Sequence, residues 1–223
     1  MYQTVLFDLD GTLTDPGVGI TNSVSYALEK YGIRTADRAE LYKFIGPPLQ
    51  DSFEMFYGFS KEEARKAVDD YREYYKDKGI YENRLYEGMD ALLQSLCDAG
   101  RTLLVATSKP EEFARQILDD FAISRYFTYV AGSNMDGTRS RKAEVIAYAL
   151  EAGKIQDLSS AVMVGDREYD IAGAKETGID AIGVLFGYGS RQELEAAGAD
   201  YLAKQPGDIG PIVCGEENGY ENI

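Results

Sequence analysis

The chain has 223 residues, 44% hydrophobic and 27% charged, which is typical of a soluble globular protein with room for one sizeable domain and a smaller one. Its 23 Lys and Arg against 38 Asp and Glu give a formal net charge of −15, which disfavours nucleic acid polymers and anionic membranes as partners. Histidine is absent, which excludes Ser-His-Asp catalysis, phosphohistidine chemistry and histidine-ligated zinc.

The two cysteines, Cys97 and Cys214, are too few for an all-cysteine zinc site, and neither has an arginine at the spacing of the cysteine phosphatases. A lone pair of cysteines in a chain of this size favours a reducing compartment. The first predicted strand begins almost at once, and we see no signal peptide or membrane span. We therefore predict a cytoplasmic protein.

The first predicted strand covers residues 4–7, a short apolar run rich in β-branched and aromatic side chains. Asp8 and Asp10 follow it on one side of an extended chain, Gly11 permits a sharp turn, and Thr12 adds a hydroxyl. Two carboxylates at the end of a buried strand repel each other unless a cation such as Mg²⁺ neutralises them. One carboxylate can also act as a nucleophile while the other carries a proton. The alternative is an ordinary Asp-Gly turn with solvated acids.

Residues 8–13, Asp-Leu-Asp-Gly-Thr-Leu, resemble the first motif of the haloacid dehalogenase superfamily, whose members are mostly phosphatases. The resemblance implies a doubly wound parallel-sheet, Rossmann-like α/β core with a helical cap inserted just after this motif. In relatives, a cap loop similar to the one that begins with Gly46 and two prolines faces the substrate, which implies a substrate contact for Gly46.

Residues 16–85 show helical periodicity without a convincing strand. The next strand, residues 102–106, begins far beyond the roughly 30-residue crossover that usually links parallel strands. We therefore expect an inserted helical cap at 16–85. The Rossmann-like core comprises residues 1–15 and 86–210, and residues 211–223 form an irregular tail.

From residue 86 onward, predicted helices and strands alternate, which favours a parallel sheet covered on both faces. In such sheets, ligands bind beyond the carboxyl ends of the strands. The predicted elements are helix 88–99, strand 102–106, helix 110–121, strand 129–131, helix 141–152, strand 161–164, helix 171–176 and strand 181–185.

Thr107 and Ser108 follow the strand at 102–106, where a hydroxyl and free backbone N–H groups suit a phosphoryl oxygen. Thr107 falls at the second motif of the resembled family, a Thr or Ser that bonds the transferring phosphoryl group. Local capping is the alternative. After the strand at 161–164, the pattern Gly-Asp-x-x-x-Asp resembles the metal-binding motif of the family. The resemblance makes Asp166 a direct Mg²⁺ ligand and Asp170 its support, together with Asp8 and Asp10.

The third motif of the family is a lysine before a helix, and many relatives of the phosphoglycolate phosphatase type carry Lys-Pro there. Residues 138–143 contain no proline, and Lys142 is assigned by its position in the chain. Lys109 is followed by proline but belongs to the second motif, where its stem can equally extend into solvent. Either lysine remains a candidate for neutralising the phosphoryl group.

By resemblance, Asp8 forms an aspartyl-phosphate, Asp10 moves the proton, and Mg²⁺, Thr107 and Lys142 hold the phosphoryl oxygens. Further phosphate or substrate contacts are assigned to Gly11, Thr12, Ser108 and Gly46. The predicted function is Mg²⁺-dependent hydrolysis of a small phosphomonoester, with phosphoglycolate and nucleoside 5′-monophosphates as the leading substrates. We expect a monomer or weak homodimer.

Several other functions fit the same residues. A sugar phosphomutase similar to β-phosphoglucomutase, or a pyrophosphatase, would use the same core. A signalling receiver also joins a phosphorylated Asp to Mg²⁺, a Thr and a Lys, but receivers are about half this length and lack a helical insertion. A non-catalytic binding module is a further alternative, and the presence of all the acidic residues of the motifs argues against it.

Overall fold

The computed structural model describes residues 1–216 and 221–222, and the chain divides into two compact units. Met1–Thr14 and Leu85–Ile223 form one, here the core unit, and Asp15–Arg84 form the other, here the helical unit. The predicted cap, residues 16–85, differs from the helical unit by one residue at each end.

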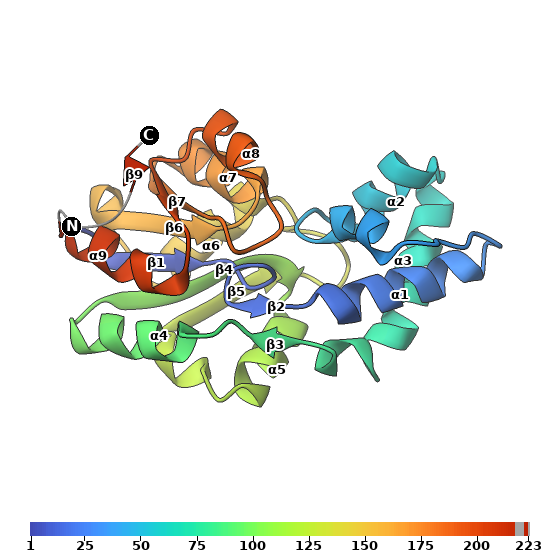
Figure 1. Cartoon of the computed structure of the whole chain (residues 1–223), viewed down its shortest axis with the longest axis horizontal. Helices are drawn as coiled ribbons and strands as arrows, with labels where there is room; N and C mark the ends of the chain where they lie inside the picture. Colours follow the sequence, from blue (N-terminus) through green and yellow to red (C-terminus); the bar gives the residue numbers. More distant parts are fainter. Residues whose placement is uncertain (217–220, 223) are drawn as a thin grey trace. The chain divides into compact units, whose positions relative to one another are not determined.

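The core unit is built on a seven-stranded sheet (Figure 1). Six neighbouring strands are parallel, and the last is antiparallel to its neighbour. In sheet order the strands are β5 (Tyr129–Ser133), β4 (Thr102–Pro110), β1 (Thr4–Phe7), β6 (Ala161–Gly165), β7 (Asp180–Val184), β8 (Tyr201–Ala203) and β9 (Glu221–Asn222). The predicted α/β core with a parallel sheet is confirmed.

Helices cover both faces of this sheet, with α6 and α7 on one side and α4 and α5 on the other (Figure 1). Because side chains alternate along a strand, Leu6, Leu104 and Met163 join the α6 and α7 side chains in one buried cluster. The helices are α4 (Met89–Asp98), α5 (Glu111–Asp120), α6 (Lys142–Ala152), α7 (Glu168–Thr177), α8 (Arg191–Ala196) and α9 (Ile209–Cys214), with the 3₁₀ segments Ser124–Tyr126, Leu158–Ser160 and Pro206–Asp208.

The strand register brings the candidate site residues to one edge of the sheet. Phe7, the last residue of β1, pairs with Val105 of β4 and with Val164 of β6. After β1, the chain adds β4 and β5 along one edge of β1, and it then returns to place β6 along the opposite edge of β1. The carboxyl ends of β1 and β6 therefore flank the point where the strand order reverses, which is where ligands bind in open α/β sheets.

The helical unit contains three α-helices, α1 (Gly17–Glu29), α2 (Leu49–Tyr57) and α3 (Lys61–Tyr75), among its described residues. Two 3₁₀ segments, η1 (Arg38–Phe44) and η2 (Gly79–Tyr81), complete it, and α1 packs against α3. Helix α3 begins with a reciprocal capping box: the Ser60 hydroxyl accepts from the Glu63 N–H at 3.3 Å, and the Glu63 carboxylate accepts from the Ser60 N–H at 2.8 Å.

The chain passes between the units through two short strands that the sequence pattern did not predict. These strands, β2 (Thr14–Asp15) and β3 (Arg84–Leu85), pair with each other. The Arg84 guanidinium also pairs with the Asp15 carboxylate at 2.7 Å. Two-residue strands carry too little hydrophobic pattern to be recognised from sequence.

The prediction of an irregular tail from residue 211 is wrong at its start, because α9 continues to Cys214. Ile209, Ile212 and Val213 of this helix are buried, so packing orders a segment that is too short to be stable alone. Residues 221–222, also predicted to be irregular, form β9, and residues 217–220 and 223 of the predicted tail lie outside the described residues. No described helix combines the length and apolar character needed to cross a membrane.

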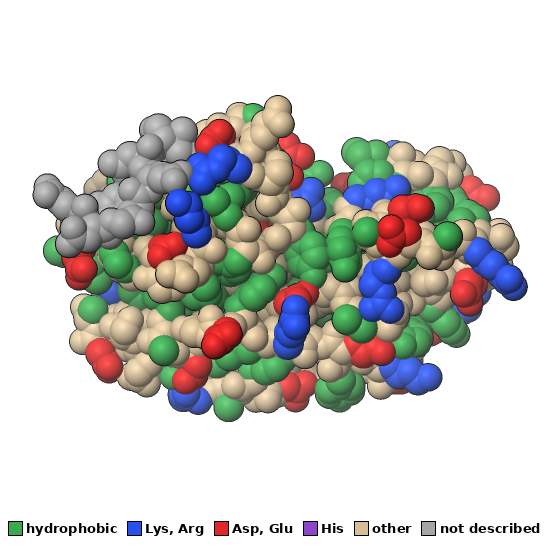
Figure 2. Space-filling model, in the orientation of Figure 1, with side chains coloured by type: hydrophobic (Ala, Val, Ile, Leu, Met, Phe, Trp, Pro, Cys, Tyr) green, Lys and Arg blue, Asp and Glu red, His purple; other side chains and the backbone are tan. Residues whose placement is uncertain are grey.

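The acidic excess of the chain does not gather into one patch on the face drawn in Figure 2, where acidic and basic side chains are interspersed. The net charge therefore acts there through many separate carboxylates, each screened by solvent and salt.

Candidate active site

The loop after β1 folds back on itself directly beyond Asp8. The Asp8 N–H donates to the Val164 carbonyl at 2.9 Å and continues the β1–β6 ladder, and its side chain is buried. Gly11 has φ +86°, and a Cβ built on it would lie 2.2 Å from Oδ2 of Asp166. Both the backbone conformation and the closeness to a carboxylate therefore require glycine here.

Three buried carboxylates meet at the carboxyl ends of β1 and β6. Asp8, Asp166 and Asp170 each place one oxygen within 4.8 Å of the others. Burial raises the pKa of Asp166 well above its ordinary value, and the charges of Asp170 and Asp8 add to this effect. Burial also raises the pKa of Asp170 to about 6, although the nearby Lys142 ammonium opposes the shift. Without a cation, burial and mutual repulsion therefore oppose the ionisation of all three carboxylates at once.

Lys142 supplies positive charge to this cluster. Its Nζ lies 2.8 Å from Oδ1 of Asp8 and 2.7 Å from Oδ1 of Asp170, and it donates to the Ala106 carbonyl at 3.1 Å. Burial favours the neutral amine, but the charges of Asp170 and Asp8 outweigh it and raise the pKa of Lys142.

The charge balance and the donor set of this site fit a divalent cation. With all three carboxylates ionised, the site including the Lys142 ammonium would carry a net charge of −2, which a divalent cation neutralises. All three carboxylates offer oxygen, the ligand that Mg²⁺ prefers. Asp8, Asp166 and Asp170 are the residues that would hold Mg²⁺, and the structure gives Asp170 a second contact, with Lys142.

Asp10 lies outside this group of potential ligands and pairs with Lys109 instead, at 2.6 Å. Its side chain is not one of the three carboxylates that cluster at the ends of β1 and β6, and its predicted role as a metal ligand stays a prediction. Of the two alternatives left open for Lys109, the structure excludes extension into solvent, since its side chain is only 6% exposed. The reason is local: β4 continues through Pro110, and α5 begins only at Glu111, so Lys109 is not on a solvated first helical turn.

The burial of the Asp10 carboxyl suits a group that carries a proton. Burial raises its pKa, although the charge of Lys109 opposes the shift. Oδ2 pairs with Lys109, whereas Oδ1 is buried without a hydrogen-bond partner among the described residues.

The predicted hydroxyl-bearing residues differ in their contacts. Thr12 Oγ1 donates to Oδ1 of Asp166 at 3.5 Å. Thr107 is buried, and its hydroxyl accepts from the Lys109 N–H at 3.3 Å, which is the local cap considered as an alternative. Ser108 is half-buried. Gly46 belongs to the helical unit, so its substrate contact stays a prediction.

A glycine-containing loop after β7 holds Asp166 and was missed from the sequence. The Tyr188 N–H donates to Oδ2 of Asp166 at 2.8 Å. A Cβ on Gly187 would lie 2.3 Å from the Asp166 Cβ, and one on Gly189 would lie 1.9 Å from its carbonyl oxygen. The available signal was the Gly-Tyr-Gly sequence just beyond a predicted strand, at the edge where ligands bind.

Helix α7 packs against the aliphatic stem of the Lys142 side chain. A Cβ on Gly173 would lie 2.8 Å from Cγ of Lys142 and 3.1 Å from the Ala143 nitrogen, so the missing side chain makes room for the lysine stem. One turn earlier, Oδ2 of Asp170 accepts from the Arg167 N–H at 3.0 Å. The same helix thus fixes both the stem of Lys142 and one of its carboxylate partners.

A profile described as haloacid dehalogenase-like hydrolase matches residues 5–184. A Pseudomonas aeruginosa protein named 5′-nucleotidase is 48% identical over 195 residues, covering 87% of this chain and 88% of that protein. Tyrosine-protein kinase PtkA of Mycobacterium tuberculosis is 42% identical over 189 residues, covering 84% of this chain but only 63% of the kinase. A crystal structure described as a predicted phosphatase from Clostridium acetobutylicum matches with a TM-score of 0.94 and 47% identity, covering 96% of this chain and 99% of that one. The expectation from the first motif is thereby confirmed, and the chain belongs to the haloacid dehalogenase-like hydrolases, as a phosphatase.

Proposed function

We propose that the chain hydrolyses a small phosphomonoester in a Mg²⁺-dependent reaction, through an aspartyl-phosphate on Asp8. The observation that carries this proposal is the position of Asp8. It lies in a buried cluster of three carboxylates, at ion-pair distance from the Lys142 ammonium. A carboxylate held beside a cation site and an ammonium is placed to attack an electron-poor phosphorus atom.

In the first step, a carboxylate oxygen of Asp8 forms a bond to phosphorus while the bond from phosphorus to the leaving oxygen breaks. Asp10 gives its proton to that oxygen, so the alcohol leaves neutral, and the burial that raises the pKa of Asp10 favours the protonated form required here. In the second step, water loses a proton to Asp10 and attacks the phosphorus. Inorganic phosphate leaves, and the Asp8 carboxylate is restored.

Positive charge lowers the barrier of both steps by meeting the charge on the equatorial phosphoryl oxygens. Lys142 supplies part of this charge from the protein. Asp8, Asp166 and Asp170 would hold Mg²⁺, which would supply the remaining positive charge. Thr107 and Ser108, beyond β4, are proposed to bond the phosphoryl group.

A nucleoside 5′-monophosphate is our leading substrate, supported by the relative named 5′-nucleotidase. Phosphoglycolate is the second candidate, from the motif resemblance. The group that accepts the phosphoryl group from Asp8 is a separate question, because a phosphomutase or a kinase would pass it to a hydroxyl of another molecule. A pyrophosphatase would also use water and would differ only in the leaving group. Water as the acceptor is the simplest choice for a phosphatase. A cytoplasmic location and a monomer or weak homodimer stay predictions.

The test is phosphate release from a panel of nucleoside 5′-monophosphates, phosphoglycolate, sugar phosphates and pyrophosphate, comparing kcat/KM with Mg²⁺ and with EDTA. We expect repeated turnover that requires Mg²⁺ and a clear preference for one phosphomonoester. Full activity in EDTA would overturn the metal dependence. A single turnover that leaves a stable phosphoprotein would favour a receiver, and an isomerised sugar phosphate would favour a mutase.

A further inference from the structure

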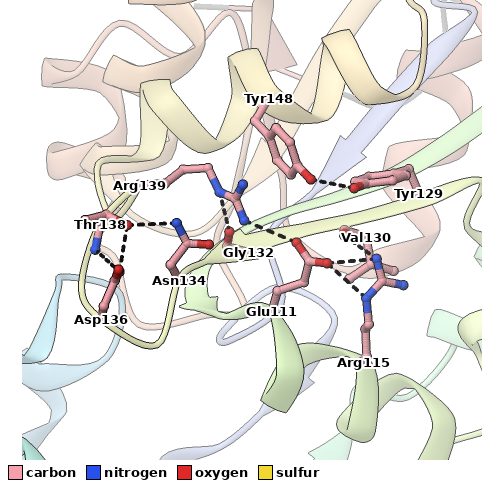
Figure 3. Close-up of polar contacts among 10 residues, drawn as sticks. All are labelled: Glu111, Arg115, Tyr129, Val130, Gly132, Asn134, Asp136, Thr138, Arg139 and Tyr148. Atoms are coloured by element: carbon pink, nitrogen blue, oxygen red, sulfur yellow. Dashed lines mark hydrogen bonds and ion pairs between the residues drawn. The ribbon is translucent and has the colours of Figure 1, made fainter.

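The loop that leads into α6 is closed by its own polar contacts (Figure 3). The Asn134 side-chain amide donates to the Thr138 hydroxyl at 2.8 Å, and that hydroxyl donates to Asp136 at 2.6 Å. The Asn134 N–H also donates to the Thr138 carbonyl at 3.0 Å. Residues 134–138 therefore form a compact turn, whose position depends on what ties it to the sheet.

The Arg139 side chain makes that tie through three kinds of contact. Its Nε donates to the Gly132 carbonyl at 2.9 Å, and one Nη donates to the Glu111 carboxylate at 3.3 Å. Its guanidinium carbon also lies 3.8 Å from the centre of the Tyr148 ring. In Figure 3 the guanidinium points between these groups. The planar fork of arginine allows hydrogen bonding at its edge and stacking on its face at once.

The partners of Arg139 are themselves held in place. Glu111, at the start of α5, accepts two hydrogen bonds from Arg115, at 3.1 and 3.0 Å. Arg115 also donates to the Val130 carbonyl of β5 at 3.0 Å. The Tyr148 hydroxyl of α6 lies 2.6 Å from that of Tyr129 on β5 (Figure 3). Arg139 therefore ties the loop to three ordered elements, β5, α5 and α6.

The backbone at Arg139 also depends on these contacts. Its φ is +50°, in the left-handed region that disfavours side chains with a Cβ. Such a conformation persists where the surroundings hold it. Shortly after Arg139, Lys142 begins α6. The preceding residue, Arg141, makes no side-chain hydrogen bond that caps this helix.

We propose that Arg139 is a positioning residue for Lys142: by tying the 134–141 loop to β5, α5 and α6, it sets where α6 begins and holds the Lys142 ammonium at Asp8. The proposal rests on the proposed role of Lys142 at the phosphoryl group. Arg139 itself is anchored by Gly132, Glu111 and Tyr148, and it acts on the reaction through Lys142.

The surroundings of Arg139 allow the side chain to be shortened without opening a closed cavity. Arg139 borders a pocket of about 350 Å³, lined also by Glu111, Glu112, Ser133, Asn134, Met135 and Tyr148, and 22% of its side chain is exposed. Water can enter the vacated space, so Arg139→Ala is expected to fold.

The matched control is Arg141, which is nearer to Lys142 in the sequence but has a 65% exposed side chain and pairs with Glu176 on the surface. We compare Arg139→Ala, Arg139→Lys and Arg141→Ala by thermal midpoint and by the kcat and KM for p-nitrophenyl phosphate at saturating Mg²⁺. We expect Arg139→Ala to lose about tenfold or more in kcat with little change in KM, Arg139→Lys to recover part of it, and Arg141→Ala to stay near wild type. Equal kcat in Arg139→Ala and wild type would overturn the proposal.

A double-mutant cycle separates positioning from general damage to the fold. If Arg139 acts through Lys142, the double variant Arg139→Ala/Lys142→Ala has the kcat of Lys142→Ala alone. Losses that multiply would instead show that Arg139 supports the fold or another group, and the proposal would fail. A kcat near wild type in Lys142→Ala would show that the proposed role of Lys142 is wrong. A low kcat in Lys142→Ala together with a wild-type kcat in Arg139→Ala would instead show that only the proposed role of Arg139 is wrong.

Discussion

A lysine between two carboxylates occurs in both units, with different surroundings. In the core unit, Lys142 lies 2.8 Å from Asp8 and 2.7 Å from Asp170, and these side chains are 5%, 4% and 1% exposed. In the helical unit, Lys30 lies 2.8 Å from Asp70 and 2.5 Å from Glu73, and these side chains are 35%, 10% and 53% exposed.

The distances alone do not distinguish the two groups, and burial does. Solvent and salt screen the Lys30 group, so its ion pairs contribute little. The Lys142 group is withdrawn from water, and a third carboxylate, Asp166, stands beside it. Ionising all three carboxylates in a buried site is costly to the fold and favours the binding of a cation.

The largest expected effect comes from removing the nucleophile. Asp8→Asn keeps the shape of the side chain and removes its charge, so we expect a folded protein with essentially no turnover. The measurement is phosphate release at saturating substrate and Mg²⁺, with circular dichroism as the check on folding. Wild-type kcat in a pure Asp8→Asn preparation would falsify the aspartyl-phosphate mechanism.

The lysines of the two groups provide the direct comparison. By analogy with removing one oxyanion donor, Lys142→Ala is expected to lose roughly 10²–10³ in kcat. Lys30→Ala is expected to keep kcat near wild type, since Lys30 lies in the helical unit, outside the acidic cluster, and is itself 35% exposed. Steady-state kinetics of both variants under identical conditions test this, and similar losses in the two would mean that burial is not what sets them apart.

The buried position of Lys109 predicts a larger effect than an exposed lysine would give. Lys109→Met keeps the stem and removes the charge that pairs with Asp10 at 2.6 Å. We expect kcat to fall by roughly 10–10², less than the roughly 10²–10⁴ that a general acid–base group itself contributes, because Asp10 remains but loses the group that orients it. A loss below threefold, measured beside Lys142→Ala, would show that Asp10 carries its proton without Lys109.

Gly173 tests how closely the Lys142 stem is fitted. Gly→Ala inside a helix ordinarily stabilises by about 0.5–1 kcal/mol. A Cβ here would lie 2.8 Å from Cγ of Lys142, so the lysine must shift. We expect Gly173→Ala to lose several-fold in kcat while its thermal midpoint stays close to wild type. A raised thermal midpoint with a wild-type kcat would show that the Lys142 side chain can accommodate the added methyl group.

The smallest effect concerns the pH dependence of stability without Mg²⁺. The pKa of Asp170 is about 6 in the folded chain against an ordinary value of 3.8. Between those values the folded state binds more protons than the unfolded state, so this group lowers stability as pH rises through the window. In EDTA, the thermal midpoint of wild type should therefore fall between pH 4 and pH 6 by a few degrees relative to Asp170→Asn. An identical pH dependence in both proteins would contradict the raised pKa.

Much of the site was predictable because the chemistry follows the strands in order. The acids Asp8 and Asp166 come directly after apolar runs, and the carboxyl ends of parallel strands meet at one edge of the sheet. The motif resemblance then identified Lys142 by its place in the chain, and the structure puts its ammonium beside Asp8. The short elements β8 and α9 were missed, because tertiary packing rather than local pattern orders them.

The amino-acid sequence by itself determined the family, the parallel α/β core and the acids that end its strands, since these depend on local pattern and chain order. Only the tertiary structure decided which lysine meets which acid. Lys109 pairs with Asp10, and Lys142 lies between Asp8 and Asp170, because strand register and the start of α6 set these distances. It also revealed the glycines against Asp166 and Lys142 and the contact of Arg139 with Glu111, which local sequence pattern does not show.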